Sequence, residues 1–270
     1  MGNIEGIEEF KSVVDLASRF LVCGSVRADL PYDKVRRVRE NARKVGLGLM
    51  GVHEWLLKRN KKYEVDDEFR QWLTVYKNES EFSAKDHASR IFISSPIRFR
   101  AIAPSGTIGI LASTTTGIEP LFAVAYKRRY LSHGTKWKHE YIIDATAQQI
   151  LDTTGGKEIE TAYALSQSLE GIERRVKFQY EIQKYVDMGI SSTINLPSWG
   201  EKGNNESTVN DTALLFAKYA SGLRGITCYP NGSRGGQPLE EVSYEEAKKH
   251  RGQVFDEEST KGCVGGSCGI

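Results

Sequence analysis

The residues best suited to chemistry in this sequence lie in one short loop and near the C-terminal end. The loop Pro104-Ser105-Gly106-Thr107 combines small side chains, two hydroxyl groups and a possible helix start behind it. Backbone N–H groups at such a helix start point toward an anion, so the loop could bind a phosphate group. The same four residue types are also ordinary in turns. From the local sequence, a phosphate site and a simple turn both remain open.

Two cysteines form the second candidate site. Cys263 and Cys268 are separated by four residues, two of them glycine, so the backbone between them can close a disulfide and reopen it. The pair could therefore carry reducing equivalents by thiol–disulfide exchange. The alternative is a pair of incidental exposed thiols, which would be liable to oxidation. The polar sequence from Gly235 onward predicts a mobile tail that carries this pair.

A glycine-rich stretch, Gly46 to Gly51, matches the G-x-G-x-x-G pattern of dinucleotide-binding folds. Asp66 stands about twenty residues beyond the first glycine, as that pattern requires. The pattern must follow a buried strand, but residues 36–44 before it are mostly charged, and no apolar strand leads into Asp66. Close packing of the glycines at a strand-to-helix junction is therefore the better interpretation.

Hydrophobic periodicity predicts the elements that position these candidates. Helices are expected at residues 7–22, 31–44, 52–58, 67–76, 138–152, 174–188 and 208–221. Thr208, with Asp211 three residues later, has the spacing of a capping box, and Gly222 is a plausible stop signal. Strands are expected at 97–103, leading into the loop, and at 223–229. This mixture of strands and helices predicts an α/β fold.

The composition argues against several classes of function. The 37 basic and 35 acidic side chains nearly cancel, leaving a formal charge of +2, so no nucleic-acid partner is expected. No apolar run approaches the length of about 18 residues that spans a bilayer. The first residues do not read as a signal peptide, so we expect no membrane association and a cytoplasmic location. The cysteines and histidines show no metal-ligand spacing, so no metal site is expected.

Several segments together resemble the large, catalytic subunit of ribonucleotide reductases, in the order in which that family carries them. They are residues 45–53, 102–108, 116–123, 192–197 and 225–229, and the Cys263/Cys268 tail. The resemblance covers nearly the whole chain. It implies an α/β fold that is the C-terminal half of a ten-stranded α/β barrel, with an N-terminal helical portion and a flexible C-terminal tail. Residues 1–234 would form the barrel portion, and residues 235–270 would form the tail.

The resemblance also implies roles for the two candidate sites. The loop that holds the substrate phosphates in the family corresponds to Ala103, Pro104, Ser105, Gly106, Thr107 and Ile108. It would bind a ribonucleotide through backbone amides and hydroxyls. Gly109 stands where the family often has Ser, which puts the hydrogen bond of that side chain in doubt. The family's catalytic C-terminal pair maps onto Cys263 and Cys268. That pair re-reduces an active-site disulfide and is recharged by thioredoxin or glutaredoxin.

The radical cysteine of the family has no counterpart in this sequence. In the family it lies on a finger loop with the pattern Asn-x-Cys-x-Glu, which does not occur here. The sequence begins just past the point where that loop would stand. We therefore expect a split or truncated catalytic subunit that is inactive alone. An N-terminal fragment of the same reductase would be its partner and would supply the radical cysteine.

One local comparison favours the adenosylcobalamin-dependent class, class II. Members with a separate tyrosyl-radical subunit relay the radical through two adjacent tyrosines near the segment matched here by residues 227–234. In this sequence Cys228 precedes Tyr229. Adenosylcobalamin, bound together with the complementary chain, is thus the expected cofactor. The alternatives are a tyrosyl-radical-dependent (class I) fragment, a non-catalytic phosphate-binding or thiol-redox module and, more distantly, an NAD-dependent oxidoreductase. The choice between diphosphate and triphosphate substrates stays open.

Overall fold

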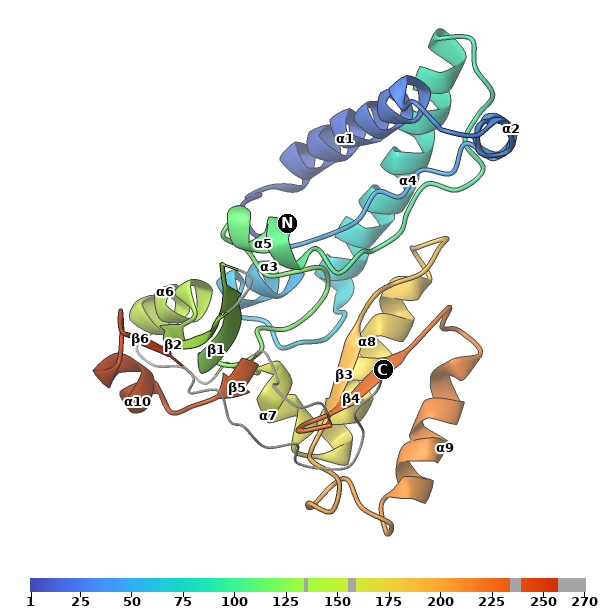
Figure 1. The fold of residues 1–270 in the computed structure, drawn as a ribbon. Helices are drawn as coiled ribbons and strands as arrows, with labels where there is room; N and C mark the ends of the chain where they lie inside the picture. The colour runs from blue at the N-terminus through green and yellow to red at the C-terminus, as the bar shows by residue number, and fades with distance from the viewer. Residues whose placement is uncertain (134–135, 155–158, 234–238, 257–270) are drawn as a thin grey trace.

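The structure is a computed structural model that describes residues 1–133, 136–154, 159–233 and 239–256. Figure 1 shows a helical half that contains α1–α4 and a second half in which short strands alternate with helices. The helices are α1 (Ile7–Arg27), α2 (Asp33–Ala42), α3 (Val52–Lys58), α4 (Asp67–Arg90), α5 (Gly106–Leu111), α6 (Ala145–Thr154), α7 (Ala162–Ser166), α8 (Leu169–Gln183), α9 (Val209–Ala220) and α10 (Tyr244–Lys249). The strands are β1 (Ala125–Ser132), β2 (Lys136–Ile143), β3 (Thr193–Leu196), β4 (Thr227–Pro230), β5 (Leu239–Glu241) and β6 (Val254–Asp256). This alternation confirms the predicted α/β class.

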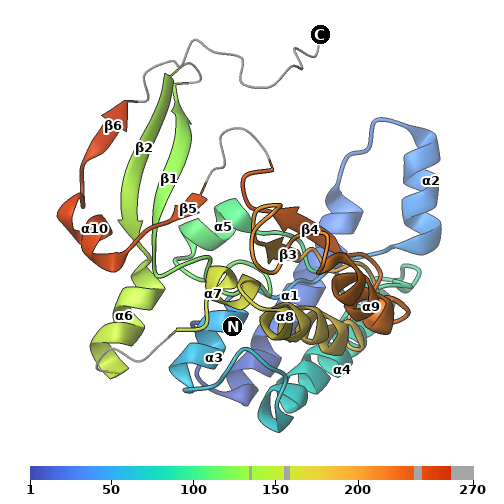
Figure 2. The same cartoon turned by 90° about the horizontal axis from the view of Figure 1, so that it is seen from below.

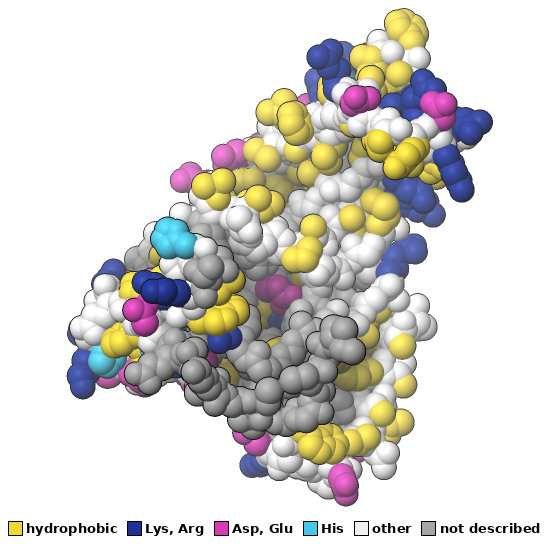
Figure 3. Space-filling view, in the orientation of Figure 1, with side chains coloured by type: hydrophobic (Ala, Val, Ile, Leu, Met, Phe, Trp, Pro, Cys, Tyr) yellow, Lys and Arg dark blue, Asp and Glu magenta, His cyan; other side chains and the backbone are white. Residues whose placement is uncertain are grey.

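The helical half is built on the pairing of α1 with α4. Phe10 and Val14 of α1 are buried one turn apart, and the ring of Phe10 lies 5.0 Å from that of Trp72 on α4. A second stripe on α1 stays exposed, and Figure 3 shows apolar side chains along this helix. Leu16 and Phe20 in that stripe are 70% and 74% exposed. In this respect α1 differs from an ordinary surface helix, whose outer face is polar.

Parallel backbone pairing joins segments that are far apart in the sequence. Single parallel bridges join Leu47 to Arg100 and Ile102 to Ile190, and β3 pairs in parallel with β4. The segments therefore follow one another in the order 45–49, 98–102, 188–196 and 227–230. Loops that follow the carboxyl ends of parallel segments form the usual ligand-binding edge of such folds. No closed sheet occurs among the described residues, so the ten-stranded barrel remains a proposal.

The stretch 97–103 is extended as predicted, but it is not a regular strand. It makes only single bridges to its two parallel neighbours, and the side chain of Asp187 supplies further bonds, because its two oxygens accept the N–H groups of Phe99 and Arg100 at 2.9 and 2.8 Å. The predicted capping box at Thr208 is also wrong. Its hydroxyl bonds to the backbone of Asn205 in the preceding turn and does not cap α9.

A second sheet is antiparallel, with the strand order β5-β1-β2-β6 (Figure 2). The helix predicted at 138–152 begins only at Ala145, because residues 136–143 form β2 and pair along their whole length with β1. Asp144 ends the strand and caps α6 through the N–H groups of Thr146 and Ala147. The expected tail also needs correction. Residues 239–256 form β5, α10 and β6, whose strands hydrogen-bond to β1 and β2, so this part of 235–270 is folded.

None of the described helices combines the length and the apolar character that are needed to cross a bilayer.

Candidate functional site

The loop Ala103–Ile108 follows the extended segment 98–102, at the carboxyl edge of the parallel layer. Its residues are exposed apart from Ser105, which is half-buried. Helix α5 begins at Gly106, so the N–H groups of Gly106, Thr107 and Ile108 lie in its first turn, where helices leave donors unpaired. Within the described part of the chain, these three donors have no hydrogen-bond acceptor. The arrangement can therefore bind an anion through backbone amides.

Ser105 gives the loop its shape. Its backbone has a φ of 49°, a left-handed conformation that is uncommon for residues other than glycine. Its Oγ accepts the N–H of Gly117 at 2.9 Å, and its carbonyl accepts the N–H of Gly109 at 2.8 Å. The Ser105 hydroxyl thus has a structural role as an acceptor, while Thr107 is exposed.

Gly109 stands at a position where the family often has serine, and it is buried. A Cβ atom built on Gly109 would lie 2.7 Å from the Cγ2 methyl of Thr116, which is closer than real Cβ contacts come. Thr116 therefore occupies the space that a serine side chain would need. The departure from the family pattern has a local packing cause, and the backbone donors of the loop are unaffected by it.

The segment Gly117–Leu121, called the tether here, connects the loop to buried side chains. Its Gly117 end donates to Ser105, and the Tyr63 hydroxyl donates to the carbonyl of Ile118. Glu119 pairs with Arg175 of α8, and its other oxygen accepts the N–H of Thr193 at 2.6 Å.

At the far end of the tether, the N–H of Leu121 donates to Nδ1 of His53 at 2.9 Å. The tether is therefore bound to α3, α8 and β3 as well as to the loop.

Burial sets the charge states along the tether. It lowers the pKa of His53 to about 3, with help from the positive charge of Arg175, so the ring is neutral. Since Nδ1 of His53 accepts a hydrogen bond, the proton of the neutral ring is on Nε2. Burial opposes the charge of Arg175, but Glu119 and Tyr63 outweigh that effect and raise the pKa of its guanidinium. Burial likewise raises the pKa of Tyr63, so its hydroxyl stays protonated and can donate to the carbonyl of Ile118.

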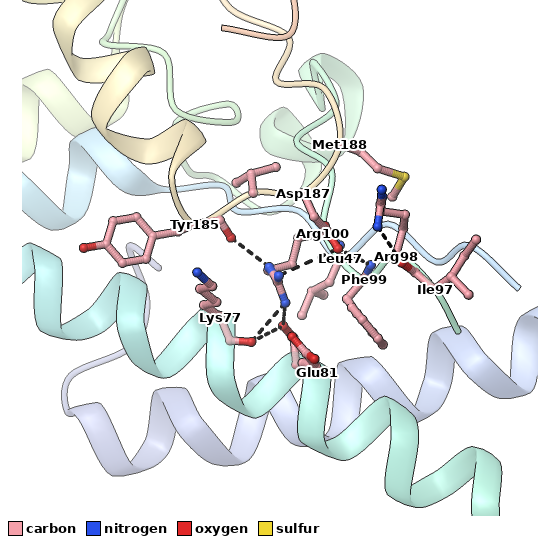
Figure 4. A network of polar contacts seen from close by, with 12 residues as sticks. Leu47, Lys77, Glu81, Ile97, Arg98, Phe99, Arg100, Tyr185, Asp187 and Met188 are labelled. Carbon is pink, nitrogen blue, oxygen red and sulfur yellow. Dashed lines mark hydrogen bonds and ion pairs between the residues drawn. The ribbon is translucent and has the colours of Figure 1, made fainter. Parts of the chain in front are cut away.

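A second buried arginine anchors the segment that leads into the loop (Figure 4). The Arg100 guanidinium donates to the carbonyls of Tyr185 and Lys77 at 2.7 and 2.9 Å, and to Ser80 Oγ at 2.9 Å. It also lies 3.7 Å from the carboxylate of Asp187. The contacts join α4 to residues 98–102 and 185–188. Arg100 and Arg175 were not predicted from the sequence, where an arginine on an amphipathic segment is normally assigned to the solvent side.

The remaining cysteines give no second site in the described residues. Cys23 is exposed on α1, with its Sγ 3.1 Å from Nε2 of His87, and Cys228 is exposed on β4. Partial burial of the thiol raises the pKa of Cys228. Cys263 and Cys268 lie outside the described residues. No cluster of three or more His, Cys, Asp or Glu side chains suited to a metal occurs in the part of the chain that the structure describes.

The glycine-rich stretch has the packing role predicted for it. A Cβ atom at Gly48 would lie 3.0 Å from the carbonyl oxygen of Ala101, and one at Gly51, whose φ is 73°, would lie 2.4 Å from the nitrogen of Gly2. Asp66 caps α4 by accepting the N–H of Phe69 at 2.8 Å. It is therefore engaged in the local fold, which argues against the ribose-binding role of the dinucleotide pattern.

The fold and the loop define an α/β protein with a potential anion-binding edge on its parallel layer. The chain belongs to the family of the ribonucleotide reductase barrel domain, whose model matches residues 3–83 and 97–229.

Named relatives agree with this assignment. A vitamin B12-dependent ribonucleoside-diphosphate reductase from Mycobacterium tuberculosis is 27% identical, over 97% of this chain and 40% of its own length. A protein of the same name from Thermoplasma acidophilum is 24% identical, over 92% of this chain and 36% of its own length. The chain thus spans about two fifths of the length of these relatives.

A solved structure shares the fold. The crystal structure of a B12-dependent (class II) ribonucleotide reductase superimposes with a TM-score of 0.70 at 16% identity. It covers 89% of this chain, which in turn covers 37% of the solved chain.

Proposed function

We propose that this chain is the C-terminal part of the catalytic subunit of an adenosylcobalamin-dependent ribonucleotide reductase. Such an enzyme reduces ribonucleotides to deoxyribonucleotides by a radical mechanism. The contribution of this chain is to hold the substrate phosphates on the loop Ala103–Ile108. One observation carries the proposal: three exposed N–H donors without acceptors in the described residues lie together in the first turn of α5.

The relatives support the substrate class. Two of them are named as reductases of ribonucleoside diphosphates, and a phage relative is named as a putative ribonucleoside-triphosphate reductase, so we propose a ribonucleotide with two or three phosphates as the substrate. A diphosphate presents two adjacent anionic groups, and a row of backbone donors at a helix start suits such a ligand. Thr107, exposed beside these donors, would add a hydroxyl to the same site.

The radical chemistry requires a second polypeptide in this proposal. The described cysteines do not suit it, because Cys23 lies on the outer helix α1 and Cys228 lies on β4, outside any Asn-x-Cys-x-Glu pattern. A complementary N-terminal fragment would supply the radical cysteine. The exposed apolar stripe with Leu16 and Phe20 supports the need for a further protein contact, since large apolar patches on soluble proteins mark interaction surfaces. The chain alone would therefore be inactive.

One cavity of the described residues was a candidate for adenosylcobalamin, and it does not fit that cofactor by itself. The cavity between α6 and Arg251, lined also by Gln149 and Asp152, has a volume of about 350 Å³. That is near the lower limit for drug-sized ligands, and a corrin ring is larger. Cofactor binding is accordingly assigned to the assembled enzyme. The cofactor would supply the radical, while this chain binds and orients the substrate.

We also retain the dithiol shuttle as part of the proposal. Cys263 and Cys268 would reduce the active-site disulfide after each turnover and would be recharged by thioredoxin or glutaredoxin. Their spacing across Val264–Ser267, with two glycines, permits a reversible disulfide.

The phosphate loop can be tested by binding alone, without the rest of the enzyme. The probe is inorganic pyrophosphate, titrated into the ¹⁵N-labelled chain. We expect the amide signals of Gly106, Thr107 and Ile108 to shift in a saturable manner. Thr107→Glu places a like charge beside the anion and should weaken binding about tenfold, whereas the neutral control Thr107→Gln should change it little. If pyrophosphate leaves these three amides unperturbed, the loop is not a phosphate site.

A further inference from the structure

We propose that Tyr63 and Arg175 are positioning residues for the phosphate loop and that they act through the tether, Gly117–Leu121. This inference rests on the proposed phosphate site and extends it to two buried side chains that do not touch the ligand. Neither belongs to the loop: Tyr63 lies between α3 and α4, and Arg175 lies on α8.

The first link joins the loop to the tether. Ser105, in its left-handed conformation, is bound through Oγ to the N–H of Gly117. Gly117 is itself left-handed, with a φ of 50°, and a Cβ atom there would lie 3.3 Å from the carbonyl oxygen of Ala103. The tether therefore runs close against the loop backbone at both of these points. Any displacement of Gly117 would be transmitted to Ser105 and to the adjoining N–H donors of α5.

The second link joins the tether to Tyr63 and Arg175. The Tyr63 hydroxyl donates to the carbonyl of Ile118, one residue beyond Gly117. The Arg175 guanidinium bonds to the Glu119 carboxylate and to the carbonyl of Thr193. One planar group thus fixes the tether relative to the start of β3. Both of these bonds come from Nη2, and Nη1 donates to the Tyr63 hydroxyl at 3.4 Å. A lysine has a single nitrogen and could not reach all three partners in the same geometry.

Burial makes these links rigid. Tyr63 is 1% exposed and Arg175 is 3% exposed. The ring of Tyr63 is packed against Phe178, with 3.9 Å between ring centroids, and it makes a T-shaped contact with the ring of His53. A buried ion pair is a costly way to obtain stability, since well-packed apolar residues often serve equally well. The ion pair of Arg175 with Glu119 does, however, set the position of the tether, and this favours a positioning role over a purely stabilising one.

The test compares two substitutions of the same chemical kind. Tyr63→Phe removes only the hydroxyl, which donates to Ile118 and accepts from Arg175. The matched control is Tyr219→Phe on α9, which removes a hydroxyl bound to Glu173 at 2.8 Å, in a cluster of α8, β3 and α9 that contains no residue of the loop or the tether. For Tyr63→Phe we expect about five- to tenfold weaker pyrophosphate binding and faster hydrogen exchange of the Gly117 amide. For Tyr219→Phe we expect neither change, even where both variants lose similar thermal stability.

Arg175→Lys provides a second variant, in which the charge is kept and the fork is lost. It should also weaken pyrophosphate binding and accelerate exchange at Gly117. If the unmodified chain binds pyrophosphate and Tyr63→Phe binds it as tightly as Tyr219→Phe does, the positioning role is refuted while the phosphate site stands. If the unmodified chain does not bind pyrophosphate at all, the phosphate site fails and the positioning role fails with it.

Discussion

His53 should make the stability of this protein depend on pH in a way that one substitution removes. The ring is 1% exposed, and its Nδ1 accepts the N–H of Leu121, so the folded chain holds it neutral. Burial lowers its pKa from 6.5 to about 3. At a pH between 6.5 and about 3, His53 is therefore protonated in the unfolded chain and neutral in the folded chain. The free energy of unfolding should therefore fall as the pH falls below 6.5.

The size of this effect follows from the shift. Each pH unit below the unfolded pKa costs about 1.4 kcal/mol, so at about pH 4.5 the loss from His53 alone is about 2.7 kcal/mol. This contribution is fully present above the unfolded pKa and is lost progressively toward pH 3. It is a substantial part of the stability of a typical domain, about 5–15 kcal/mol.

Urea unfolding between about pH 7.5 and 4.5 measures this contribution when the unmodified chain is compared with His53→Asn. Asn presents an acceptor oxygen near the position of Nδ1 and does not titrate. The variant should be less stable at neutral pH, because a smaller side chain leaves a cavity. Its stability should nevertheless fall less steeply with acid, and the two curves should converge. Parallel curves would show that His53 is not held neutral, and the reasoning from its burial would be wrong.

Two further predictions concern the loop and the terminal thiols. Gly109→Ser should destabilise the chain by about 1–3 kcal/mol in urea unfolding, because the new side chain meets the Thr116 methyl, and adding Thr116→Ser should recover most of the loss. A Gly109→Ser variant as stable as the unmodified chain would contradict the packing account. Cys263→Ser or Cys268→Ser should leave about one turnover in the reconstituted enzyme, but should abolish thioredoxin-driven multiple turnover and be rescued by dithiothreitol. Full thioredoxin-driven turnover by both variants would exclude the shuttle.

Local sequence was sufficient for most of the helices. The apolar spacing in α1 and α4 and the cap at Asp66 depend on neighbours within a few residues, so those helices could be predicted, although α4 continues to Arg90, well past the predicted end at residue 76. The β1–β2 hairpin could not be separated from a helix by the same means. Residues 138–143 are extended because β1 pairs with them along its whole length, and that pairing is a tertiary choice.

The sequence by itself determined the chemistry available at the candidate site. Small residues and hydroxyls at 104–107 specify a loop that can expose backbone donors, and glycines at 48 and 51 specify close backbone contacts. Only the tertiary structure decided what holds that loop in place. Arg175 and Tyr63 are separated from the loop by about 70 and 40 residues of sequence, and nothing local marks them as its supports. Their role arises because folding removes water from around them and leaves the tether as their partner.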